Sequence, residues 1–102
     1  QRDLDEAERL FRRALGRDPR NLEARVGLGA ALGIQGKTGE AIRTLEEGRA
    51  LGLASPSLYN ALAMAYYQNR ERQKAVAILK ESLRIDPGQK SARATLDEWE
   101  RP

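Results

Sequence analysis

A chain of 102 residues can form one domain at most and buries only a modest share of its surface, so stability must come from well-matched contacts between its elements. It has no cysteine and no histidine, which excludes disulfides, thiolate or imidazole catalysis and the ordinary zinc and haem ligand sets. Its net charge of +3 comes from 18 basic and 15 acidic residues mixed along the chain, and no apolar run is long enough to span a membrane. We therefore expect no cofactor, no metal, no nucleic-acid partner and no membrane insertion.

Six helices are predicted, and the links between them are so short that consecutive helices should be antiparallel neighbours. In chain order they cover residues 3–17, 22–34, 38–51, 56–69, 72–85 and 90–100. Ser55 and Pro56 indicate where the fourth helix begins, because serine caps a helix well and proline lacks an N–H that the first turn does not need. Gly36, with Gly39 soon after, is the residue expected to take positive φ after the second helix, and Asn69 is its expected counterpart after the fourth.

A pattern of small and large residues recurs every 34 residues. An alanine is followed four places on by a large apolar residue, and three places after that by a small residue. The copies read Ala7, Phe11, Ala14, then Ala41, Leu45, Gly48, then Ala75, Leu79, Ser82, with Pro19 and Pro87 at matching ends. These offsets place the residues on one helix face. A repeat of this size predicts stacked helices, because a single unit cannot bury its own apolar face.

The repeat resembles the tetratricopeptide repeat (TPR), a helix hairpin with small and large residues at fixed positions. The third copy carries the resemblance through Tyr59, Leu62, Ala63, Tyr66, Ala75, Leu79, Ser82 and Pro87. The second carries it through Leu28, Gly29, Leu32, Gly36, Ala41 and Leu45, and the first through Leu4, Ala7, Phe11, Ala14 and Pro19. The resemblance implies an all-α solenoid of antiparallel hairpins, with about two and a half repeats and a C-terminal capping helix. The expected divisions of this single domain, residues 1–102, are a partial repeat in 1–21, repeats in 22–55 and 56–89, and the cap in 90–102.

Three residues of the second copy depart from the family pattern. Arg25 stands where a large apolar residue is usual, and Leu53 stands where proline is expected. Gly48 should weaken the interior of its helix by about 1 kcal/mol relative to alanine. Gly29 and Ala63 fit the pattern, and we expect them to let the two helices of each hairpin approach closely.

The last helix is expected to cover the final repeat. Ala92, Leu96 and Trp99 lie at i, i+4 and i+7, so they form one apolar stripe while the charged residues of this helix face water. In the alternative interpretation, Trp99 is an exposed anchor for a partner.

In the family, the first helix of each hairpin lines the concave face. Carried onto this sequence, that rule predicts a mildly apolar groove that holds a peptide or helix of a partner protein. Its expected residues are Val26, Ala30, Ile34, Asn60, Met64, Tyr67 and Gln68. Asn60 and Gln68 would supply hydrogen bonds to a peptide backbone. The alternative is a gently concave surface with scattered apolar residues and no ligand.

The leading hypothesis is therefore a protein–protein interaction module that is not an enzyme. One alternative is a structural assembly or oligomerisation module, and another is the TPR segment of a larger enzyme or secretion factor. The family's clamp for acidic C-termini is not expected, because the positions of its lysines, asparagines and arginine read Val26, Ala30, Asn60, Ser91 and Thr95. An RNA-binding helical repeat is disfavoured by the uncharged groove row.

The first helix leaves an unpaired apolar face, because Leu4, Ala7 and Leu10 lack a hairpin partner. We expect this face to pack against an upstream helix of a longer parent protein or against a second copy, which would give a two-fold dimer. The compartment stays open. The cytoplasm is favoured, and the periplasm is the alternative if a signal peptide lies upstream.

Overall fold

The computed structural model describes residues 2–102 and leaves Gln1 outside the described part. Its elements are α1 (Arg2–Arg17), α2 (Leu22–Ile34), α3 (Thr38–Ala50), α4 (Pro56–Gln68), α5 (Arg72–Ile85) and α6 (Lys90–Glu100). All six predicted helices are confirmed, and their ends differ from the prediction by one residue at most. No β-strand occurs between residues 2 and 102.

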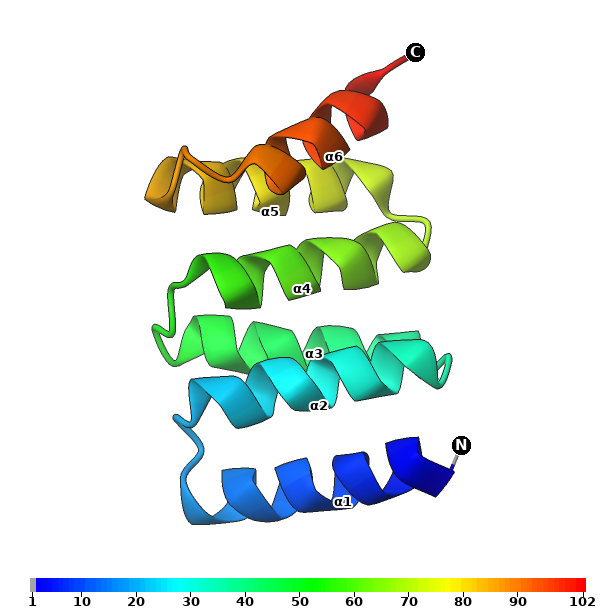
Figure 1. Cartoon of the computed structure of the whole chain (residues 1–102), viewed down its shortest axis with the longest axis vertical. Coiled ribbons are helices and arrows are strands. Elements are labelled where there is room, and N and C mark those ends of the chain that lie inside the picture. Colours follow the sequence, from blue (N-terminus) through cyan, green and yellow to red (C-terminus); the bar gives the residue numbers. More distant parts are fainter. Residues whose placement is uncertain (1) are drawn as a thin grey trace.

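The helices stack into a short solenoid. Each helix packs on the next one in the chain, and α2 also contacts α4, so the first helices of the two full hairpins lie side by side. Figure 1 shows α1 and α6 at opposite ends of the stack, whose longest dimension is 40 Å. The predicted all-α solenoid of antiparallel hairpins is therefore confirmed.

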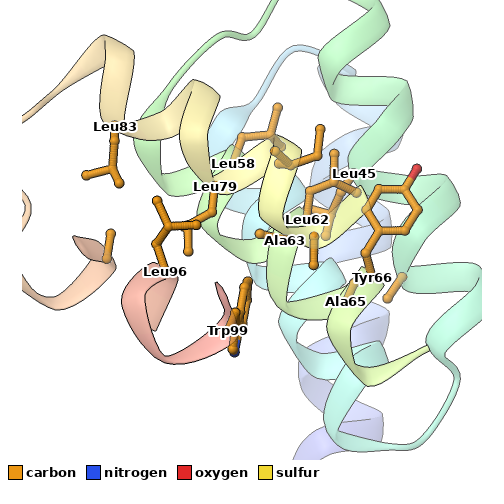
Figure 2. Packing of buried hydrophobic residues seen from close by; sticks show 14 of the residues in the cluster. Leu45, Leu58, Leu62, Ala63, Ala65, Tyr66, Leu79, Leu83, Leu96 and Trp99 are labelled. Atoms are coloured by element: carbon orange, nitrogen blue, oxygen red, sulfur yellow. The ribbon is translucent and has the colours of Figure 1, made fainter. Parts of the chain in front are cut away.

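One apolar core runs through the stack. Leucines from α3, α4, α5 and α6 meet in it, among them Leu45, Leu62, Leu79 and Leu96 (Figure 2). Gly29 lets α2 approach α3, because a Cβ atom at this position would lie 2.7 Å from the Leu45 side chain. The residue one repeat later, Ala63, is fully buried, as expected for a small residue at a close helix contact.

Three helices end in the same hydrogen-bonded turn with a residue of positive φ. That residue is Gly36 after α2 (φ 83°), Gly52 after α3 (φ 80°) and Arg70 after α4 (φ 62°). The prediction for Gly36 is confirmed. The prediction for Asn69 is wrong, because Asn69 has φ −85° and Arg70 occupies the position one repeat after Gly36. The turn geometry, set by the repeat register, prevails over the better intrinsic tolerance of asparagine for this conformation.

The turn after α3 explains why Leu53 replaces the expected proline. Its N–H donates to the Gly48 carbonyl at 3.0 Å, which closes the turn around Gly52. Proline has no N–H and could not close it. By contrast, α1 and α5 end in Asp-Pro turns, where Asp18 and Asp86 accept hydrogen bonds from backbone N–H groups two residues on.

The last helix covers α5 and the end of α4. Ala92, Leu96 and Trp99 are all buried, which confirms the predicted stripe, and Trp99 is 5% exposed. Figure 2 shows Leu96 and Trp99 among the core residues. Arg72 of α5 donates to the Trp99 carbonyl and so fixes the C-terminal end of α6. Trp99 therefore packs within the protein and is not an exposed anchor.

Candidate functional site

A shallow depression of about 250 Å³ lies between α2 and α4. Its floor and walls are formed by Gly29, Ala30, Gly33, Ile34, Ala61, Met64, Ala65 and Gln68. Most of these residues are small, so the two helices leave room between them that larger side chains would fill. We call this surface, together with the adjoining Tyr67, the α2–α4 groove.

Large apolar side chains border the groove and remain open to solvent. Ile34 is 68% exposed, Met64 50% and Tyr67 43%. The helices that carry them are poor in charge: α4 has no charged residue, and α2 has only Glu23 and the buried Arg25. A helix face that meets only water is normally charged or polar, so this composition indicates a surface suited to an apolar ligand.

The polar residues predicted for the groove differ in their availability. Gln68 lines the depression and is exposed, so its side-chain amide is accessible from solvent. Asn60 is already engaged, since its Nδ2 donates to Gln89 Oε1 at 2.8 Å and its Oδ1 accepts from Ser82 Oγ at 2.6 Å. Asn60 therefore links α4 to α5 and to the turn before α6, and we leave it out of the proposed binding surface.

Two other predicted residues have part of their surface covered by the protein. Val26 is half-buried and packs against the core, so it stabilises the hairpin as much as it lines a surface. The Tyr67 ring stacks on Trp99 with a centroid distance of 4.4 Å and an interplanar angle of 6°. One face of Tyr67 thus belongs to the cap, and the capping helix holds the tyrosine in place at the end of the groove.

Ionisable groups with altered acidity lie away from the groove. Burial, together with a hydrogen bond to the Glu46 carboxylate, raises the pKa of Tyr66 to about 12. This pair joins α4 to α3 on the core side. Among residues 2–102 there is no cluster of three or more histidine, cysteine or carboxylate side chains that could hold a metal ion. Nor does any helix in this part of the chain have the length and hydropathy needed to cross a bilayer.

The sequence predicted the rim of the groove and part of its floor, Ala30 and Gly33, but missed Gly29, Ala61 and Ala65. Gly29 and Gly33 lie four residues apart on α2, and Ala61 and Ala65 lie four residues apart on α4. These two small-residue pairs were a usable signal. Only the contact between α2 and α4 reveals that they face the same depression.

Comparison with protein families assigns the chain. Two family models described as tetratricopeptide repeat match it, one over residues 1–64 and the other over residues 56–89. The chain belongs to the tetratricopeptide repeat family. Domains of this family generally mediate protein–protein interaction and generally act without catalysis of their own. A comparison with curated protein sequences gives no match.

Solved structures share the fold. The crystal structure of MamA superposes with a TM-score of 0.84 at 27% identity, covering 95% of this chain and 57% of that one. TTC0263, a thermophilic TPR protein of Thermus thermophilus, gives a TM-score of 0.84 at 22% identity, with 94% and 49% covered. MamA 41-end from Desulfovibrio magneticus RS-1 gives 0.82 at 23%, with 95% and 55% covered. This chain spans about half the length of these proteins.

Proposed function

We propose that the α2–α4 groove binds an apolar segment of a partner protein, held as an extended peptide or as a helix. The observation that supports this most strongly is the combination of three large exposed apolar side chains, Ile34, Met64 and Tyr67, with a floor of glycine and alanine. Such a surface favours a ligand that inserts apolar side chains of its own between the two helices.

The chemistry of the groove also restricts the ligand. No charged side chain lines the depression, so an acidic or basic motif would gain nothing there. Gln68 offers one amide, which can donate to and accept from a ligand backbone. We therefore expect a ligand whose affinity depends on apolar contacts and changes little with salt.

A random-peptide display library selected on the wild-type protein supplies the test ligand. Peptides that are enriched should bind with a dissociation constant that rises at least tenfold in Ile34→Glu and in Met64→Glu, because each change places a charge in the apolar contact. Both residues are exposed, so the helical circular-dichroism signal and the melting temperature should change little.

The matched control is Ile85→Glu at the end of α5. Ile85 is 46% exposed and lies outside the groove, so this variant receives the same charge and should bind the selected peptide as the wild type does. Equal binding by all three variants, or a library that yields no specific peptide, would contradict the proposal.

A further inference from the structure

The open face of α1 differs from its counterparts in the other repeats. Leu10 occupies the position that Thr44 holds in α3 and Ile78 holds in α5, each 34 residues further on. Thr44 is 9% exposed and Ile78 is 4% exposed, whereas Leu10 is 54% exposed. The repeat geometry thus buries this position wherever a neighbouring helix is present. Within residues 2–102 no helix covers it on α1, which lies at one end of the stack (Figure 1).

Charged side chains are arranged in order along this face. Asp3, Leu10 and Arg17 are spaced by seven residues and lie on one line along the helix, with Glu6 and Arg13 beside that line on the same side. The first half of the face is therefore acidic and the second half basic, with the leucine midway. Within residues 2–102, none of these four charged side chains forms an ion pair with another residue.

The order of charges along α1 is complementary to that of a second α1 that runs in the opposite direction. If a second α1 runs antiparallel across the first, with a two-fold axis at Leu10, then Asp3 of each copy faces Arg17 of the other. Glu6 of each copy then lies beside Arg13 of the other, and the two Leu10 side chains meet at the axis. Opposite charges at these four places and an apolar contact between them favour the arrangement.

We propose that residues 1–102 form a two-fold dimer through antiparallel packing of α1 on α1 of a second copy. This surface is distinct from the α2–α4 groove, so the dimer leaves both grooves open. The contact uses one helix from each copy, which is small for a protein interface, and much of its specificity is ionic. The dimer should therefore be weak and should dissociate as salt rises.

The other exposed end of the stack does not fit this face. Asp97 of α6 occupies the position that Gly29 and Ala63 hold in α2 and α4, where a small residue permits close packing of a hairpin partner. In a second copy's α6 packed on α1 as a hairpin partner, Asp97 would stand at the close helix contact that requires a small residue, so its charged side chain could not be accommodated without loss of hydration. A closed dimer is thus favoured over an open chain of copies joined end to end.

Charge reversal combined with mixing tests the proposal by analytical ultracentrifugation over a concentration series. Asp3→Arg/Glu6→Arg makes the whole face basic, and Arg13→Glu/Arg17→Glu makes it acidic. Each variant alone should have a dimer dissociation constant at least tenfold above that of the wild type, and an equimolar mixture of the two should form a heterodimer. Asp97→Arg/Glu98→Arg, with the same change in net charge on α6, should dimerise as the wild type does.

A single cysteine tests the geometry, because the chain has none of its own. Leu10→Cys places one thiol from each copy at the two-fold axis, so mild oxidation should give a covalent dimer rapidly. Ile34→Cys lies in the groove at a position that is more exposed than Leu10, 68% against 54%, and should nevertheless cross-link slowly. The proposal is overturned if the wild type stays monomeric at high concentration, if the mixed variants do not associate, or if both cysteine variants cross-link at the same rate.

Discussion

Arg25 of α2 lies across Gly48 of α3, so close that a Cβ atom on residue 48 would come within 2.4 Å of the Arg25 Cδ atom. The guanidinium then reaches two carbonyl oxygens, Pro19 O at 2.7 Å and Thr44 O at 3.0 Å. Arg25 is only 5% exposed. Arg25 and Gly48 each depart from the family pattern, and the missing side chain of Gly48 makes the room that Arg25 occupies.

Because of this pair, a glycine-to-alanine substitution, which normally stabilises a helix, should destabilise the protein at residue 48. Gly48→Ala should lower the free energy of unfolding by about 1 to 3 kcal/mol, because the added methyl group overlaps the Arg25 side chain. In the background of Arg25→Ala the same substitution should raise it by up to about 1 kcal/mol. The helix preference of alanine then acts against one remaining close contact, the end of the flexible Leu58 side chain at 3.2 Å. Urea denaturation of the wild type, the two single variants and the double variant forms a double-mutant cycle, which measures the coupling energy between residues 25 and 48.

Gly16→Ala is the matched control for that cycle. Gly16 lies in α1, and a methyl group added there would have no neighbouring atom within 4 Å, so alanine should stabilise the protein at this position. If Gly48→Ala stabilises the wild type as Gly16→Ala does, the compensation between residues 25 and 48 does not exist.

Arg70 offers a gain in stability. It has φ 62°, a conformation that costs a residue with a side chain about 1 kcal/mol and costs glycine little. Arg70→Gly should therefore raise the free energy of unfolding by about 0.5 to 1 kcal/mol, whereas Asn69→Gly, at φ −85°, should lower it. Thermal melts of both variants check which residue has positive φ. A higher melting temperature for Asn69→Gly than for Arg70→Gly would contradict the turn geometry.

Tyr66 makes stability depend on alkaline pH. Its folded-state pKa is raised to about 12, above the value of about 10 for an exposed tyrosine, so the fold favours the protonated hydroxyl. Its contribution is complete below about pH 10 and is lost as pH rises toward about 12. The destabilisation caused by Tyr66→Phe, measured by urea denaturation, should therefore shrink across this range. A destabilisation that stays constant across this range would contradict the raised pKa of Tyr66.

Removal of residues 90–102 should uncover Leu79 and Leu83, which are 3% and 7% exposed in the full chain. The truncated protein should melt at a lower temperature and associate through this apolar surface. Calorimetry and light scattering measure the two effects. A truncated chain as stable and as monomeric as the full one would mean that α6 does not act as a cap.

Helix positions were predictable because the pattern repeats three times, and each copy supports the register of the others. The capping stripe was predictable for a similar reason, since Ala92, Leu96 and Trp99 lie on one face of a helix whose other residues, apart from Ala94, are polar. Positions defined by the period of one helix need no knowledge of tertiary contacts.

Contacts between helices were harder to predict. The fit of Arg25 against Gly48 depends on how closely α2 and α3 pack, and neither residue alone indicates it. Asn60 has the character of a binding residue, yet its amide bonds to Ser82 and Gln89, which come from other elements. The sequence alone predicts the face on which the groove lies. It does not show which polar side chains of that face are already hydrogen-bonded to other parts of the protein.

Met64 gives the most direct test of the groove, because it is the single methionine of the chain and is half exposed there. Labelling its methyl group with ¹³C yields one NMR signal that reports on this surface alone. Titration with a peptide selected on the wild-type protein should shift that signal until saturation. The dissociation constant from this titration should equal the one from calorimetry, and Ile34→Glu should raise both values. A peptide that binds by calorimetry and leaves the Met64 methyl signal unchanged would contradict binding in the α2–α4 groove.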